Sequence, residues 1–114
     1  MKIDVRREGS LAVLVPDGSI TIGESCDALR TALDAVMDAG ATSIIVDGSR
    51  IRYLDSTGMG EIIAALRRLK PTGGKVGIAS PSPKVREILD ITGLTAIFVM
   101  GDDEASVRQK LGTP

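Results

Sequence analysis

The sequence predicts one α/β domain in which about four α-helices pack against a mixed sheet of four to five strands. The chain has 114 residues, 43% of them apolar, and a chain of this size buries about two-thirds of its surface in a single core. The apolar spacing changes repeatedly between that of a strand and that of a helix, which predicts the order β-β-α-β-α-β-α-β-α. Connections are short and contain no linker, so one domain is expected over residues 1–114.

A β-hairpin is expected at the N-terminus. Ile3 and Val5 alternate with charged residues, as in a strand with one buried face, and Gly9-Ser10 supplies a turn. The uninterrupted apolar run 11–15 is typical of a strand covered on both faces. Pro16-Asp17-Gly18 has the chemistry of a turn and is expected to end this second strand.

A helix, a strand and a second helix follow. From about Glu24 apolar residues recur at helical spacing, and Gly40 is suited to end that helix. The β-branched run Ser43–Asp47 predicts a buried strand. Residues 56–70 again carry one apolar stripe, and Pro71 is expected to stop this helix.

The last third continues the alternation, beginning with a strand over 75–79. Ser82-Pro83 predicts a helix start, with serine as the cap and proline in the first turn, and Thr92-Gly93 ends that helix. A strand over 97–100 and a helix over 102–111, capped by Asp102 or Asp103, complete the fold.

The composition excludes several classes of function. The formal net charge is −1, so the chain lacks the cationic excess that binds nucleic acid. Without histidine it has neither the usual catalytic triads nor the commonest metal ligand, and we expect no catalytic residue, metal or cofactor. No apolar run reaches the roughly 18 residues of a membrane span, and the lone Cys26 fits a reducing compartment, so a cytoplasmic protein is expected.

The segment 53–60 differs from the rest of the chain. It places Asp55, Ser56 and Thr57 before two glycines, where a loop enters the second helix. A helix N-terminus has unpaired N–H groups and a partial positive charge, so it tolerates an anion. Two interpretations stay open from the residues alone: Asp55 or Ser56 caps the helix, or Ser56 is phosphorylated and acts as a binding switch.

Three motifs occur in order along the chain: Leu54-Asp55-Ser56-Thr57-Gly58-Met59-Gly60, then Gly73-Gly74, then Ile88-Leu89-Asp90-Ile91-Thr92-Gly93-Leu94. With them the chain resembles the STAS-domain anti-sigma-factor antagonists over nearly its whole length. In that family an ATP-dependent anti-sigma factor serine kinase phosphorylates the serine after the aspartate, and a PP2C-type phosphatase removes the phosphate. The unphosphorylated form binds the kinase and so frees a sigma factor. The resemblance implies a STAS fold and Ser56 as the phosphoacceptor. From the charge and the lack of a long apolar run, we expect no direct contact to nucleic acid or membrane.

The resemblance also implies a partner-binding surface around the phosphoacceptor. Asp55 is its neighbour on that surface, Gly58 and Gly60 leave room for close approach, and Thr57 is a less favoured second hydroxyl. The implied partner-binding residues are Thr21, Asp55, Ser56, Thr57, Gly58, Met59 and Gly60.

Two of these positions carry alternatives. Many family members have an acidic residue where this chain has Thr21, which leaves open which kinase is recognised. Met59 is expected either in the core, which its helical spacing favours, or exposed as a partner contact.

A cluster of positive charge lies at the other end of the second predicted helix. Arg67, Arg68 and Lys70 are suited to a solvated helix C-terminus, where the helix dipole favours cations, or to an acidic partner surface.

A second function also stays open: a STAS subunit bound constitutively to a larger assembly, such as a lipid-transport ATPase or a stress-signalling complex.

Overall fold

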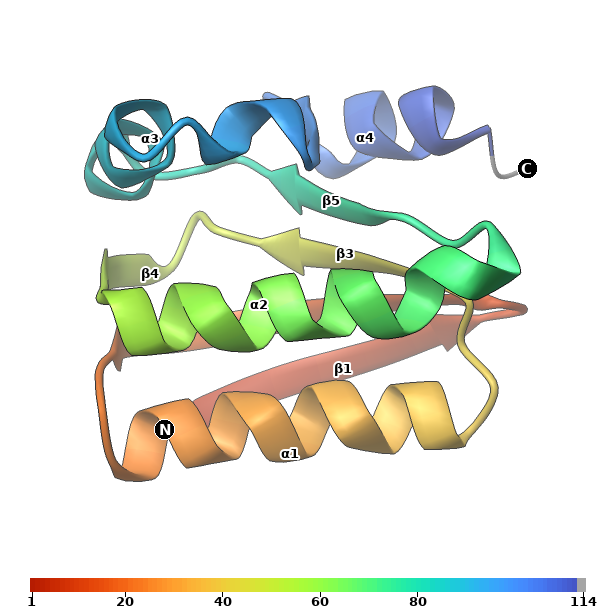
Figure 1. Ribbon diagram of the computed structural model, residues 1–114, viewed down its shortest axis with the longest axis horizontal. Coiled ribbons are helices and arrows are strands. Elements are labelled where there is room, and N and C mark those ends of the chain that lie inside the picture. The colour runs from red at the N-terminus through yellow and green to blue at the C-terminus, as the bar shows by residue number, and fades with distance from the viewer. Residues whose placement is uncertain (113–114) are drawn as a thin grey trace.

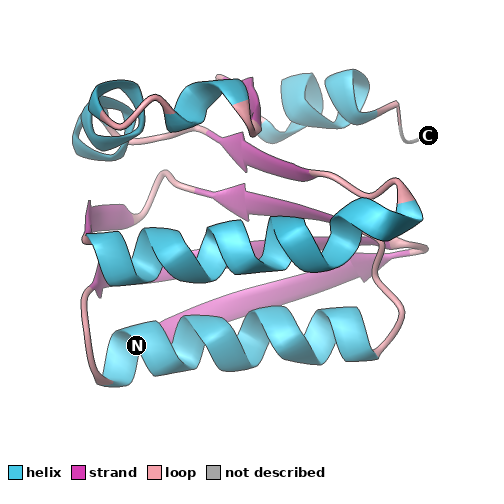
Figure 2. Ribbon diagram, in the orientation of Figure 1, coloured by secondary structure: helices cyan, strands magenta, loops and turns pink. Residues whose placement is uncertain are grey.

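The structure, a computed structural model that describes residues 1–112, is a sheet of six strands with four α-helices (Figure 1, Figure 2). The strands are β1 (Lys2–Glu8), β2 (Leu11–Ile20), β3 (Ser43–Asp47), β4 (Ile51–Leu54), β5 (Val76–Ala79) and β6 (Val99–Gly101). The helices are α1 (Glu24–Asp38), α2 (Ser56–Leu69), α3 (Pro83–Ile91) and α4 (Glu104–Leu111), with short 3₁₀ turns η1 (Lys70–Thr72) and η2 (Leu94–Ala96). The predicted α/β class is confirmed, with one strand more than the sequence indicated.

The strands run in the order β1-β2-β3-β5-β6, and β4 pairs with the far end of β2. β1 and β2 form the expected antiparallel hairpin, while β2, β3, β5 and β6 are parallel to one another. Each α-helix follows one of the parallel strands or β4. The helix N-termini therefore gather at the edge of the sheet where these strands end.

The helices divide unequally between the two faces of the sheet. Side chains of α1, α2 and α3 form the larger core, and α1 and α2 lie side by side in front of the sheet in Figure 1. Val107 of α4 is fully buried in a smaller cluster on the other face, formed with Leu11, Val13, Ile45 and Ala79. The larger core supports α2 along its whole length, because Met59, Ile62, Ala65 and Leu69 are all buried in it.

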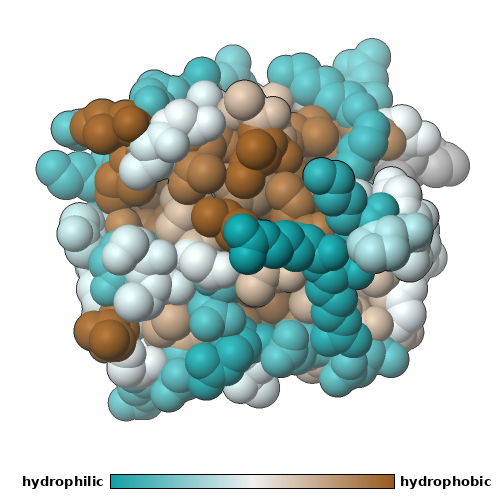
Figure 3. Space-filling view, viewed as in Figure 1, coloured by the Kyte–Doolittle hydropathy of each residue, from teal (hydrophilic) through white to brown (hydrophobic). Residues whose placement is uncertain are grey.

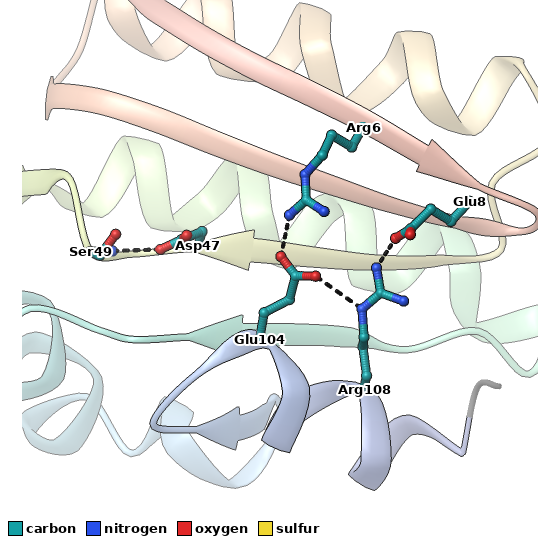
Figure 4. A network of polar contacts seen from close by, with 6 residues as sticks. All are labelled: Arg6, Glu8, Asp47, Ser49, Glu104 and Arg108. Carbon is teal, nitrogen blue, oxygen red and sulfur yellow. Dashed lines mark hydrogen bonds and ion pairs between the residues drawn. The ribbon is translucent and has the colours of Figure 1, made fainter.

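Ion pairs join α4 to the strand at the edge of the sheet (Figure 4). Arg6 of β1 pairs with Glu104, and Glu8 of β1 pairs with Arg108. Within α4 the Arg108 Nε donates to Glu104 at 3.0 Å. These ion pairs connect α4, which packs mainly against β3, β5 and β6, to the outermost strand of the sheet.

The expectation that Pro16-Asp17-Gly18 ends β2 is wrong. β2 continues to Ile20, because its second half pairs in parallel with β4, a strand that the sequence did not indicate. The turn-type residues make an irregularity in the strand instead, with a register shift between Gly18 and Ser19. Gly18 has a φ of 125°, and its N–H donates to the Arg50 carbonyl at 3.0 Å, so glycine's conformational freedom is used inside the strand.

The predicted helix starts and ends fall close to the observed ones. The Ser82 hydroxyl accepts from the Val85 N–H, and Asp103 rather than Asp102 caps α4 by accepting from the Ser106 N–H at 2.7 Å. The helix predicted over 56–70 ends at Leu69 and tightens into η1. The strand predicted over 97–100 begins later, at Val99, because η2 and the two residues that follow it occupy the chain before it.

Candidate functional site

Asp55 is the N-cap of α2. It has an extended backbone (φ −88°, ψ −179°), and its Oδ1 accepts from the Gly58 N–H at 2.9 Å and from the Thr57 hydroxyl at 2.6 Å. These bonds satisfy one of the otherwise unpaired N–H groups of the first helical turn. The structural interpretation of this segment is therefore confirmed for Asp55, the residue before the hydroxyl of interest.

The second oxygen of Asp55 reaches a distant part of the chain. Oδ2 accepts from the Ile22 N–H at 2.8 Å, and the Asp55 N–H donates to the Ile20 carbonyl at 3.1 Å. Through these bonds one residue holds the connection between β2 and α1 against the start of α2. The site thus combines two loops that are more than thirty residues apart in sequence.

The carboxylate of Asp55 is stabilised in its charged form. The Thr57 hydroxyl donates the bond with the largest effect and the Gly58 N–H the next, and together with the Ile22 N–H they lower the pKa of Asp55 below its ordinary value. Partial desolvation opposes this shift but does not reverse it. Both oxygens are occupied by internal bonds, so Asp55 is a bonded anchor of the site rather than a free acid.

Ser56 is the first residue of α2, and it is exposed. Within residues 1–112 its hydroxyl has no hydrogen-bond partner. Thr57 differs in both respects, since it is half-buried and its hydroxyl donates to Asp55. Of the two hydroxyls at this helix start, only that of Ser56 is accessible and uncommitted.

The residues that follow divide between the core and the surface. Met59 is only 4% exposed and lies in the larger core, as its spacing favoured, so its side chain does not form part of the surface. Gly58 is buried too, and a Cβ at this position would lie 2.7 Å from both Ile20 and Leu54. Gly58 therefore allows α2 to approach the sheet, whereas Gly60 is exposed with open space around it.

The loop that Asp55 holds contains one predicted site residue and one that the sequence did not indicate. Thr21 is half-buried, and its backbone N–H donates to the Ser25 hydroxyl at 2.9 Å. Ile22, next in the chain, is 77% exposed and is bonded through its N–H to Asp55. An apolar residue after a strand predicts burial, so no signal in the sequence marked Ile22 as part of the surface.

The arrangement offers a nucleophilic hydroxyl, which can accept a phosphoryl group, and a contact surface. A serine hydroxyl at the positive end of a helix is suited to carry an anionic group. Among the described residues no group of three or more His, Cys, Asp or Glu side chains is placed to hold a metal ion. None of the helices within residues 1–112 has the length and apolar character that crossing a membrane requires.

Comparison with known proteins places this geometry in a family. The model of the STAS domain family matches residues 2–107. The anti-sigma F factor antagonist of Paenibacillus polymyxa is 26% identical over 86 residues, which are 75% of this chain and 74% of that protein.

Solved structures share the fold. The anti-sigma factor antagonist SpoIIAA in its unphosphorylated form has a TM-score of 0.82 and 22% identity, with 99% of each chain covered. The phosphorylated form of the Bacillus cell fate determinant SpoIIAA has a TM-score of 0.74 and 19% identity, covering 96% of this chain and 99% of that one. The matched residues include the whole of α2 and the loops that meet at its start, and the chain belongs to the STAS domain family.

Proposed function

We propose that this chain is an anti-sigma factor antagonist whose binding is switched by phosphorylation of Ser56. In its unmodified form it binds an anti-sigma factor serine kinase in the cytoplasm and so releases a sigma factor. The observation that carries the proposal is the Ser56 hydroxyl, which is exposed and uncommitted while its neighbours Asp55 and Thr57 are bonded to the fold. The names of the relatives, anti-sigma factor antagonists, support the same class of partner.

The chemical step is phosphoryl transfer from ATP held by the kinase. The Ser56 Oγ attacks the γ-phosphorus, the new O–P bond forms as the bond to ADP breaks, and the serine proton passes to a base of the kinase. A PP2C-type phosphatase would reverse the modification by hydrolysis. This chain contributes only the acceptor, and the neighbouring carboxylate of Asp55 is already bonded to the fold.

The phosphate would change binding more than it changes the fold. It adds a charge of about −1.5 to −2 at the N-terminal end of α2, where the helix dipole favours an anion. A partner seated on this corner would meet a new dianion next to the ionised Asp55, and repulsion and desolvation would weaken the complex.

The proposed contact surface consists of Ser56 with the exposed positions around it. Gly60 leaves space one turn further along α2, and Ile22 supplies an exposed apolar side chain from the loop beside it. We include Thr21 and Thr57 at the half-buried margin of this surface. Gly58, Met59 and Asp55 act from within, because they fix the position of α2 and of the loop.

The test uses the purified chain with an anti-sigma factor kinase from the same genome and ATP. We expect one phosphate at Ser56 by mass spectrometry, no phosphate on Ser56→Ala, and one phosphate, again at Ser56, on Thr57→Val, which removes only the second hydroxyl. We also expect Ser56→Asp to weaken kinase binding by about tenfold or more with an unchanged circular dichroism spectrum.

Two results would contradict the proposal. Kinase binding that Ser56→Asp leaves as tight as the wild type rules out the switch. Co-purification with a larger assembly that is indifferent to phosphatase treatment would favour the constitutive STAS subunit instead.

A further inference from the structure

An apolar groove lies beside the C-terminal half of α2, away from Ser56. It runs between α2 and the segment that contains η2, and it has a volume of about 740 Å³. Its apolar lining consists of Ile63, Leu66, Leu94, Ala96 and Ile97. Figure 3 shows hydrophobic side chains gathered on this face of the molecule, with long hydrophilic side chains at their border.

The polar part of the lining is cationic. Arg67, Lys70 and Lys75 line the groove, and none of the acidic residues that the structure describes does. Among residues 1–112 none of these three side chains has a hydrogen-bond or ion-pair partner. The groove thus displays three unneutralised positive charges on a chain whose formal net charge is −1.

Arg68, the neighbour of Arg67, shows that a cation at the C-terminal end of α2 can be paired within the fold. Its guanidinium lies toward α1, where it pairs with Asp34 at 3.6 Å and with Asp38. The cationic cluster predicted from the sequence is therefore divided: Arg68 is neutralised within the fold, and Arg67 and Lys70 face the groove.

We propose that this groove binds an acidic amphipathic helix of a protein partner. The apolar floor suits the side chains that such a helix places at i, i+4 and i+7, and the three cations suit carboxylates along its flanks. The position along α2 separates this surface from the switch, since Arg67 lies about 16 Å from Ser56 along the helix axis. Binding here is independent of phosphorylation, and it goes beyond the proposed function.

The charge pattern favours a peptide over a lipid. A single-chain amphiphile carries one anionic headgroup and can neutralise one or two of the cations, whereas a helix with several carboxylates can neutralise all three. A flat anionic membrane surface could reach the cations and the exposed Ile97, but it would leave the half-buried Ile63, Leu66 and Leu94 of the groove uncovered.

The experiment uses a fluorescent synthetic peptide of about four helical turns, with leucines on one face and glutamates on both flanks. A matched peptide carries lysine in place of every glutamate. Fluorescence anisotropy measures binding to the full chain, and amide NMR shifts locate it. We expect the acidic peptide to bind at least about tenfold more tightly than the basic one, with shifts in residues 66–75 and 94–97.

Charge-reversal variants test the residues. Reversal of the groove cations in the triple variant R67E/K70E/K75E should weaken acidic-peptide binding by about tenfold or more. The control K2E/R50E/K84E makes the same change in net charge at cations outside the groove and should alter binding by less than about twofold. Ser56→Asp should leave peptide binding unchanged, which separates this test from that of the switch.

Four outcomes would overturn the proposal. Three of them are equal binding of the two peptides, equal losses in the two triple variants, and NMR shifts centred on residues 21–22 and 56. Binding of oleate or of vesicles containing anionic lipid, without binding of the acidic peptide, would assign the groove to a lipid and would equally overturn it.

Discussion

The two ends of α2 use charge in opposite ways. At the N-terminal end the carboxylate of Asp55 is bonded to Thr57, Gly58 and Ile22, and the exposed group beside it is the neutral hydroxyl of Ser56. At the C-terminal end Arg67 and Lys70 line an apolar groove, and their charged groups have no ion-pair or hydrogen-bond partner among residues 1–112. A neutral surface changes greatly when one phosphate is added, whereas a permanently charged groove does not. The first end is therefore suited to a switch and the second to constant binding.

The largest effect is expected where the N-terminal end meets the core. Gly58→Val would place a branched side chain into Ile20 and Leu54, which a Cβ alone approaches at 2.7 Å, and we expect a loss of about 3 kcal/mol in the free energy of unfolding. Urea denaturation measures it. Gly60→Val is the control, because a Cβ there meets nothing within 4 Å, and its effect should stay below about 1 kcal/mol. Equal losses would show that helix propensity rather than close packing governs this end.

A smaller effect is expected from the anchor of the site. Asp55→Ala removes bonds to Gly58, Thr57 and Ile22, and we expect the melting temperature to fall by about 10 °C. Asp103→Ala removes the comparable cap of α4, where among residues 1–112 the carboxylate accepts only from the Ser106 N–H, and it should lower the melting temperature about half as much. If the two variants lower the melting temperature equally, the bond from Asp55 to the loop contributes no stability beyond that of an ordinary helix cap.

The same anchor should make stability depend on pH. The pKa of Asp55 is lowered in the folded chain, so its contribution is fully present above the ordinary value of about 4 and is lost as the pH falls through the lowered value. We expect the difference in urea midpoint between the wild type and Asp55→Asn to be constant above about pH 5 and to shrink below about pH 4. A difference that stays constant down to pH 2 would mean that the charge of Asp55 is not what the bonds stabilise.

Local patterns predicted most of the fold. The apolar stripes gave α1 and α2, and side-chain caps such as Ser82 and Asp103 gave the starts of α3 and α4. The strand β4 was missed because it has four residues, two of them exposed, and its pairing with β2 depends on a segment that looks like a turn. Propensity cannot reveal a strand that exists only through a distant partner.

The residues of the candidate site also differ in whether local sequence or a distant contact determines their place. Ser56 could be found because its motif is contiguous in sequence. Ile22 could not, because its place beside Ser56 depends on a hydrogen bond to Asp55 across 33 positions. The division of Arg68 from Arg67 was equally hidden, since it depends on where α1 places Asp34 and Asp38.

The smallest effect should separate the paired arginine of α2 from the unpaired one. Arg68→Ala breaks half-exposed ion pairs with α1, and we expect it to lower the free energy of unfolding by about 0.5 kcal/mol at low salt and by less at high salt. Arg67→Ala breaks no ion pair within the described residues and relieves repulsion among the groove cations, so stability should stay the same or rise slightly. Urea denaturation at two salt concentrations measures both. A surface residue that serves binding need not stabilise the fold. A loss in the free energy of unfolding for Arg67→Ala equal to that for Arg68→Ala would therefore mean that Arg67 stabilises the fold and is not reserved for the groove.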